Sequence, residues 1–253
     1  MLFKYLNIRI VFKPLFVPTL FLIIVFPILI FLGTWQINRL IWKEDLIKFY
    51  QNQSSSDYLQ LSKKKILSED IEFRKVKLKG YFLNKKEIYI SGKTYEGNIG
   101  FHVITPFKIK NNEIILVNRG WVSENYRDPN KRRFSLIYNK TEINGIIRYP
   151  QKKGYFVPDN EPKKGFWFTI NPKEINKFLR LKNEVVVNQF YIDALKDEGK
   201  IKLPIGANIN PNLRNQHLSY AITWYSLALV LIVIYILFHR SENRISFKRT
   251  ANE

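Results

Sequence analysis

The chain contains no cysteine, and only three of its 253 residues are histidine. Without cysteine, disulfide bonds, thiolate chemistry, and zinc or iron–sulfur sites built on cysteine are excluded. The histidines, His102, His217 and His239, are far apart in the sequence. The sequence also lacks HExxH, GxSxG, Walker and GxGxxG patterns. We therefore expect a protein that is not an enzyme, with an active site of dispersed Asp and Glu as the remaining enzymatic alternative.

Acidic residues are scarce as well, because 21 Asp and Glu accompany 41 Lys and Arg, for a net charge of +20. Such an excess can indicate contact with nucleic acid or with an anionic membrane surface. The lysines are scattered and form no long stripe, and the abundance of Lys, Asn and Ile is typical of an AT-rich genome. We therefore expect membrane lipids as partners and no nucleic acid.

Charged residues are absent from two long apolar stretches, residues 15–33 and 218–238. As helices they span roughly 28 and 31 Å, close to the hydrocarbon thickness of a bilayer. The first stretch is too long for a cleaved signal peptide and has no A-x-A cleavage site after it. The sequence therefore predicts two transmembrane helices, the first kinked at Pro18 and Pro27, with Trp35 and Trp42 at the interface.

Short basic segments, residues 1–14 and 239–253, flank the two spans. Short tails rich in Lys and Arg stay in the cytoplasm, whereas long domains cross the membrane largely regardless of charge. We therefore expect cytoplasmic N- and C-terminal tails and a periplasmic domain at 34–217. The expected location is a bacterial inner membrane and not a mitochondrial one, because no Arg- and Ser-rich transit segment precedes the first span.

The region between the spans begins with a helical pattern at 35–65, interrupted by a polar break at 51–57, and then changes to short strands. One further helix is predicted at 171–179, with Asn171 as N-cap and Pro172 at the first helical position. The predicted fold class is therefore a membrane α+β protein, in which two transmembrane helices flank a mostly antiparallel sheet or partial barrel with a few helices. The strands are expected at 73–81, 87–90, 99–107, 113–122, 141–149, 155–157, 166–170 and 184–192, with a hairpin turn at Asn111 and Asn112.

One face of the second span is a candidate cofactor site, because His217 lies at its outer end. At 100° per residue, Tyr220, Ala221, Trp224 and Ala228 lie on the same stripe. The imidazole could be an axial ligand of haem iron, the alanines would leave a recess for a flat ring, and the aromatic groups would wall it. The alternative is that aromatic belt residues and small residues simply pack against a neighbouring helix. His239, about 33 Å further along the helix, cannot join this site.

Several separated motifs resemble the Surfeit locus protein 1 family, in the same order along the chain. The motif residues are Gly33-Thr34-Trp35-Gln36 with Arg39; Arg74, Val76 and Gly80; Gly100 with Thr105-Pro106; Val117-Asn118-Arg119-Gly120-Trp121-Val122; and Asn215, His217-Leu218, Tyr220-Ala221 and Thr223-Trp224. The resemblance covers about residues 30–238, although Ser123, Gln216 and Ser219 depart from the family pattern. For Arg119, Gly120 and Trp121 we favour structural roles: bracing a turn, supplying a positive φ and filling the core.

The resemblance implies an assembly factor for haem–copper cytochrome c oxidase. In bacterial members of the family, this means binding haem a and supporting its insertion into the catalytic subunit. The family's haem-linked histidine and tryptophan fall on His217 and Trp224. The implied partners are subunit I of the oxidase and the haem a synthesis machinery. The alternative is a membrane scaffold without a cofactor that stabilises nascent oxidase subunits.

Overall fold

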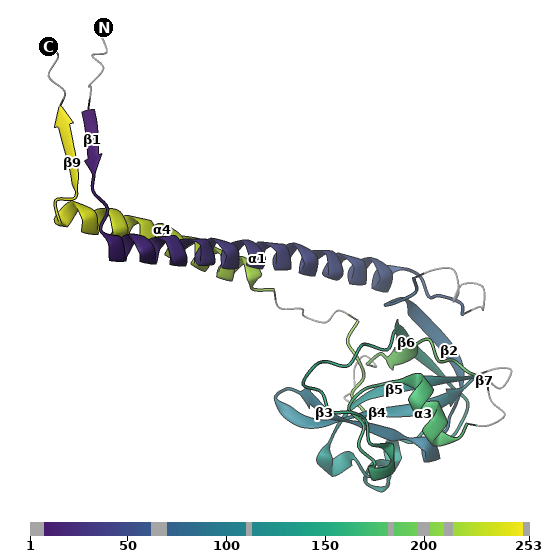
Figure 1. Cartoon of the computed structure of the whole chain (residues 1–253). Coiled ribbons are helices and arrows are strands. Elements are labelled where there is room, and N and C mark those ends of the chain that lie inside the picture. The colour runs from purple at the N-terminus through teal and green to yellow at the C-terminus, as the bar shows by residue number, and fades with distance from the viewer. Residues whose placement is uncertain are drawn as a thin grey trace. The chain divides into compact units, whose positions relative to one another are not determined.

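The computed structural model describes residues 8–61, 70–109, 113–181, 185–196, 203–209 and 215–249. The chain forms two compact units. One unit joins its two end regions, and the other is the central region Phe49–Asn212. The first contains two long helices that lie side by side, and the second contains the β-sheet (Figure 1). This arrangement confirms the predicted fold class of two apolar helices flanking a mostly antiparallel β domain.

The two predicted spans lie within helices α1 (Phe16–Ser55) and α4 (His217–Ser241). Both helices are long and apolar enough to cross a membrane. In the most apolar stretch of each, only 6% and 11% of the residues are buried, unlike the core helix of a soluble protein. Pro18 lies in the first turn of α1, where its missing N–H costs nothing, and Pro27 lies inside the helix.

Helix α1 is longer than the sequence pattern predicted, because it continues without interruption from the apolar stretch through Ser55. The polar break predicted at 51–57 is therefore wrong for residues 51–55. Those residues are Gln, Asn and Ser, whose helix propensities are only modestly unfavourable, and no Gly or Pro is among them. The helix predicted at 35–65 thus ends at Ser55, and residues 62–69 lie outside the described part of the chain.

A two-stranded antiparallel ribbon follows the helix pair at its far end. Strand β1 (Ile8–Phe12) pairs with β9 (Ile245–Arg249), so that both end regions of the chain come together (Figure 1). The Phe12 ring lies 5.4 Å from the His239 ring, centroid to centroid, and the Lys13 N–H donates to the Arg244 carbonyl at 3.0 Å. These contacts join the ribbon to the C-terminal end of α4.

The central unit is a β-barrel, because the pairings of five strands return to their starting point. In ring order they are β4, β2, β6, β8 and β5, and β5 pairs again with β4. The pairings of β5 with β7 and β8 are parallel, and the others in this sheet are antiparallel. The strands are β2 (Lys75–Phe82), β3 (Ile88–Tyr95), β4 (Asn98–Lys108), β5 (Glu113–Ser123), β6 (Thr141–Arg148), β7 (Val185–Val186) and β8 (Tyr191–Ala194).

Two predicted strands are wrong. Residues 155–157 form a tight turn closed by the Val157 N–H and the Gly154 carbonyl, at 3.1 Å. Within 166–170, Phe166 and Trp167 make single bridges to Glu161 and Ile90, because the left-handed Gly165 turns the chain just before them. The strand predicted at 184–192 is two short strands, β7 and β8. The turn predicted at Asn111 and Asn112 lies outside the described residues.

The predicted helix at 171–179 is confirmed as α3 (Pro172–Leu179). The Asn171 side chain accepts hydrogen bonds from the backbone N–H groups of Lys173 and Glu174, which is the capping arrangement expected from the sequence. Ile175 is fully buried and packs with the cluster that contains Trp167 and Tyr191. Three short 3₁₀ segments that matter for the site are η1 (Asn84–Lys86), η3 (Glu124–Tyr126) and η4 (Pro129–Ser135).

Candidate functional site

The antiparallel helices α1 and α4 are held in register by polar contacts at both ends. At the end of the pair that carries His239, the Leu15 N–H donates to His239 Nε2 at 3.0 Å, and the Thr19 and Tyr235 hydroxyls lie 2.7 Å apart. Towards the end that carries His217, the hydroxyl oxygens of Thr34 and Tyr225 lie 3.1 Å apart. Polar contacts between helices stabilise helix pairs in membranes.

Gly33 has a specific role in this pairing. A Cβ atom at this position would lie 2.7 Å from a carbon of the Tyr225 ring, so only glycine lets the ring approach the α1 backbone. The neighbouring Thr34 then reaches the hydroxyl of the same tyrosine. Gly33 and Thr34 therefore form the contact surface for Tyr225, and this contact fixes the position of the next residues of α1 relative to α4.

His217 is the first residue of α4, and its side chain contacts Gln36 of α1. The distance between His217 Nδ1 and Gln36 Oε1 is 2.7 Å. An amide oxygen can only accept a hydrogen bond, so Nδ1 is the donor in this contact. Among the described residues, no hydrogen-bond partner of His217 Nε2 is present. A neutral imidazole whose proton is on Nδ1 presents the lone pair of Nε2, which is the state that an imidazole needs to bind a metal.

The predicted stripe on α4 divides into two parts in the structure. Ala221 and Ala228 are only 1% and 2% exposed. Ala221 lies one turn after His217 and one turn before Tyr225, both of which bond to α1, so α1 covers it. Tyr220 is 54% exposed and Trp224 is partly buried. The recess predicted at Ala221 is thus filled by the neighbouring helix, whereas the aromatic flank remains accessible.

His239 belongs to the packing of the pair. Its ring is fully buried; Nε2 accepts a hydrogen bond from the Leu15 N–H, and Nδ1 lies 2.9 Å from the Tyr235 carbonyl. Both ring nitrogens are thereby occupied. The expectation that His239 stands apart from His217 agrees with this placement at the opposite end of α4.

The motif at 117–122 lies in the middle of β5 and contains a β-bulge. Val103 pairs with Gly120 and Ile104 pairs with Asn118, so that Arg119 is the extra residue between them. The bulge breaks the alternation of side chains along the strand, and Arg119 is buried as a result. Gly120 has a φ of +115°, and a Cβ atom there would lie 1.9 Å from the Ile205 carbonyl oxygen.

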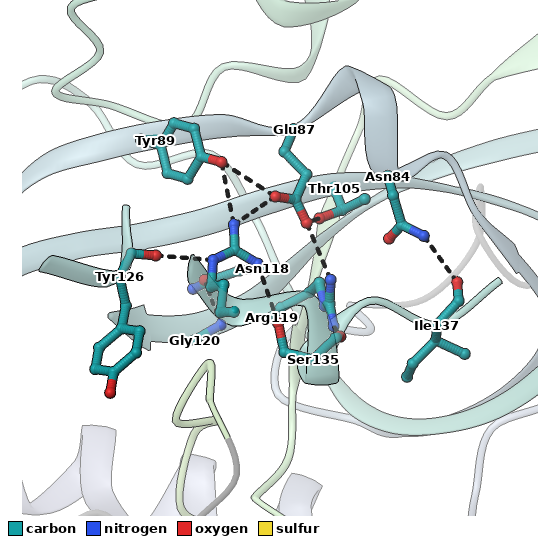
Figure 2. Close-up of polar contacts among 11 residues, drawn as sticks. Asn84, Glu87, Tyr89, Thr105, Asn118, Arg119, Gly120, Tyr126, Ser135 and Ile137 are labelled. Carbon is teal, nitrogen blue, oxygen red and sulfur yellow. Dashed lines mark hydrogen bonds and ion pairs between the residues drawn. The ribbon is translucent and has the colours of Figure 1, made fainter. Parts of the chain in front are cut away.

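A buried ionic network surrounds Arg119 (Figure 2). Glu87, whose side chain is 2% exposed, accepts from Arg119 at 3.0 Å and forms an ion pair with the fully buried Arg132. Thr105 and Tyr89 donate to the same carboxylate, at 3.2 and 3.1 Å. Arg119 also donates to the Ser135 carbonyl, which ties β5 to η4. The guanidinium groups therefore brace a loop within the domain.

The charges in this network shift the pKa of its members. Burial, opposed by the Glu87 carboxylate, lowers the pKa of Arg119 from its ordinary value. Burial, and then the negative charge of Glu87, raises the pKa of Tyr89 to about 12. The raised pKa of Tyr89 keeps its phenol protonated near neutral pH, where it donates to Glu87.

Asn118, on the other side of the bulge, organises a second polar chain. Its Oδ1 accepts from the Gly120 N–H at 3.1 Å, which orients the amide so that Nδ2 faces Asp193 and His102, at 2.8 and 3.2 Å. Burial, and secondarily the charge of Lys93, lowers the pKa of His102 to about 4. Burial raises the pKa of Asp193. His102 is therefore a neutral acceptor at Nδ1.

Trp121 is a core residue. It is buried, and its Nε1 donates to the Lys93 carbonyl at 3.1 Å. Gly100 makes room for it, because a Cβ atom there would lie 2.7 Å from the indole ring. Arg119, Gly120 and Trp121 thus have the structural roles favoured from the sequence, although Arg119 braces η4 and not a turn of its own strand.

Three residues that contact the motif side chains, Glu87, Arg132 and Gln36, could not be found from sequence spacing alone. Glu87 and Arg132 lie 32 and 13 residues from Arg119 in the sequence, with no local pattern that connects them. Gln36 did have a signal, since it is the last residue of the Gly-Thr-Trp-Gln motif. Within the part of the chain that the structure describes, no group of three or more His, Asp or Glu side chains could hold a metal ion. A metal bound through protein side chains alone therefore has no site there.

The chain is similar to known proteins over most of its length. A model of the SURF1 family matches residues 23–229. A SURF1-like protein of Rickettsia conorii is 37% identical over 225 residues, which cover 86% of this chain and 89% of that protein. A SURF1-like protein of Caenorhabditis elegans is 32% identical, with 85% and 72% covered. Surfeit locus protein 1 of Mus musculus is 29% identical, with 78% and 67% covered.

Proposed function

The chain belongs to the SURF1 family, and from that membership and the geometry at His217 we propose that it is an assembly factor for haem–copper cytochrome c oxidase. In this proposal it binds haem a in the membrane and supports its insertion into the catalytic subunit. Its partners are subunit I of the oxidase and the machinery that synthesises haem a. The chain itself catalyses no reaction.

The observation that supports the proposal is the placement of His217, whose Nδ1 contacts Gln36 and whose Nε2 has no hydrogen-bond partner among the described residues. The residue lies at the end of a helix able to span a membrane, and its other ring nitrogen is already engaged by Gln36. Tyr220 and Trp224 lie on the same side of α4 within two turns, at exposures that leave their rings able to contact a flat apolar group. These residues fit a haem held through one imidazole.

The structure limits where the ring could lie. Because α1 covers Ala221, the group would rest on the flank of α4 next to Tyr220 and Trp224 and not between the helices. Haem supplies the iron that an imidazole can ligate. His217 would hold the iron, and Trp224 would contact the macrocycle without bonding to the metal. Ala221 would contribute by letting α1 approach closely enough for Gln36 to reach His217.

We propose the topology predicted from the tails, with both ends in the cytoplasm and the barrel in the periplasm of a bacterial inner membrane. Lys13, Arg240 and Arg244 lie at the same end of the helix pair, opposite His217, which supports this orientation. His217 would then face the periplasmic side. A reporter that works only outside the cytoplasm should be active when it is fused at residue 130. Activity of a reporter that works only in the cytoplasm, fused at the same residue, would overturn the topology.

The experiment for haem binding is an absorption spectrum of the full chain purified after co-expression with the enzymes of haem a synthesis. We expect a Soret band in stoichiometric amount, lost in His217→Ala. The matched control is His102→Gln, which removes an imidazole from the barrel and should leave the band unchanged. A wild-type band in His217→Ala would refute this ligand, and absence of a band in the wild type would refute haem binding.

A cofactor-free scaffold is the second candidate, and one feature of the barrel favours it. Tyr155 and Phe156 are 94% and 93% exposed at the tip of the turn at 154–157. Two adjacent aromatic rings in water are unfavourable unless a partner covers them. Replacing both by Ser should weaken co-purification of nascent oxidase subunits if this candidate is correct, while leaving the Soret band intact.

A further inference from the structure

We propose that Gln36 of α1 is a positioning residue for His217, fixing the tautomer in which Nδ1 is protonated and Nε2 is free to bind iron. This inference rests on the proposed haem site, but the bond itself is a property of the chain alone. The two residues are 181 positions apart in the sequence, and the bond between Gln36 Oε1 and His217 Nδ1 is 2.7 Å long.

Gln36 is held in place by the residues that precede it. Gly33 receives the ring of Tyr225, and Thr34 contacts the hydroxyl of that ring at 3.1 Å. These contacts set the rotation and the height of α1 against α4 two turns along α4 from His217. Gln36, two residues beyond Thr34, is thereby directed at the first residue of α4, where the backbone is no longer constrained by a preceding helical turn.

The chemical consequence concerns the choice between the two ring nitrogens. A neutral imidazole has one N–H and one lone pair, and the hydrogen bond made by one nitrogen decides which nitrogen remains for a metal. The amide oxygen accepts the Nδ1 proton, so the lone pair lies on Nε2. Hydrogen-bond partners of this kind, behind a metal-binding histidine, typically change metal affinity by 10–100-fold.

The other two histidines of the chain provide internal references. At His239, the Leu15 N–H donates to Nε2 and the Tyr235 carbonyl lies at Nδ1, so this ring has its proton on Nδ1. At His102, Nδ1 accepts from the Asn118 amide, so this ring has its proton on Nε2. One chain thus contains one histidine of each tautomer, and His217 is expected to match His239.

The first test needs no haem. NMR of the full chain, labelled with ¹⁵N-histidine and held in lipid nanodiscs, gives one pattern of ring-nitrogen signals for each of the three histidines. The pattern that disappears in His217→Ala belongs to His217. We expect the His217 pattern to match that of His239 in the wild type and in Gln36→Glu, whose carboxylate also accepts the Nδ1 proton. Gln36→Met, of similar length but without an acceptor, should lose the Nδ1–H preference. A His217 pattern like that of His102, or one indifferent to Gln36→Met, would overturn the inference.

The second test measures the dissociation rate of haem a from the same variants. We expect Gln36→Met to release haem about 10–100-fold faster than the wild type and Gln36→Glu to restore slow release. Thr19→Val is the matched control, because it removes the contact with Tyr235 at the opposite end of the same helices, and it should change neither the tautomer nor the release rate. Equal losses in Thr19→Val and Gln36→Met would assign Gln36 to helix packing and overturn the inference.

The two tests separate this inference from the proposed function. If Gln36 controls the tautomer but the wild type binds no haem a, the proposed function fails and the positioning of His217 stands. If the wild type binds haem a through His217 and neither the tautomer nor the release rate depends on Gln36, the inference fails and the function stands.

Discussion

The helix pair and the barrel use polar side chains in opposite ways. In the barrel, the carboxylate of Glu87 is surrounded by Arg119, Arg132, Tyr89 and Thr105, and each of these groups is occupied inside the protein. On the helix pair, His217 has a partner at one ring nitrogen and none among the described residues at the other. The comparison shows that the motif-bearing cluster in the barrel satisfies its polar groups within the protein, whereas one ring nitrogen of His217 has no partner among the described residues.

The largest effect is expected from Glu87→Ala in the barrel. Two buried guanidinium groups would then lack their shared carboxylate, and breaking a buried ion pair in this way costs about 3–5 kcal/mol. Denaturant unfolding, followed by the fluorescence of the buried Trp167 and Trp121, should show this loss of stability. Glu142→Ala, which removes a carboxylate from an exposed ion pair with Lys79, is the matched control and should be nearly silent. Equal stability of the two variants would contradict a structural role for the network.

A smaller effect is expected from Ala221→Leu on the helix pair. Because α1 covers Ala221, a larger side chain should force the helices apart at a cost of about 1–3 kcal/mol. Cross-linking yield between cysteines placed at Thr19 and Tyr235 reports the pairing, which is feasible because the chain has no cysteine of its own. Ile222→Leu, at the next, exposed position, should leave the yield unchanged. Unchanged pairing with selective loss of haem in Ala221→Leu would instead indicate an open recess at Ala221.

A third effect, confined to acidic pH, concerns the pH dependence of the barrel. The folded-state pKa of His102 is about 4, lowered from 6.5 chiefly by burial. Between these values the unfolded chain binds a proton that the folded chain does not. The free energy of unfolding therefore falls as the pH decreases from 6.5 to 4, with a slope of up to about 1.4 kcal/mol per pH unit.

The difference in pH dependence between wild type and His102→Gln isolates this contribution. NMR titration of the full chain should place the pKa of His102 near 4. A pKa close to 6.5 would show that His102 is solvated. It would contradict the account in which the polar groups of the barrel are buried and paired while His217 keeps one ring nitrogen without a partner among the described residues.

The sequence predicted the elements whose patterns are local. Both spans, helix α3 with its Asn171 cap, and most strands follow from apolar runs, capping residues and alternation. The chain between 150 and 170 was misjudged, because aromatic residues such as Phe166 occur there in turns closed by Gly165 and by the Gly154 carbonyl. Closure of the barrel depends on pairings such as β5 with β8, which no local pattern encodes.

The site was predictable only in part for the same reason. Helical geometry alone predicts a stripe of His217, Tyr220, Ala221, Trp224 and Ala228, but it does not predict the burial of the two alanines. That requires the register of α1 against α4, which Gly33 and Thr34 establish through Tyr225. The inward direction of Arg119 required the bulge at Val103 and Ile104, a property of two paired strands and not of either strand alone.

The most direct test of the central proposal is pulsed EPR of the ferric haem a complex of the full chain, labelled with ¹⁵N-histidine. With only three histidines in the chain, the hyperfine coupling can be assigned by substitution. We expect coupling between the iron and one imidazole nitrogen in the wild type, unchanged in His102→Gln and absent in His217→Ala. A coupling that persists in His217→Ala, or a bound haem with no histidine coupling in the wild type, would contradict the assignment of His217 as the axial ligand.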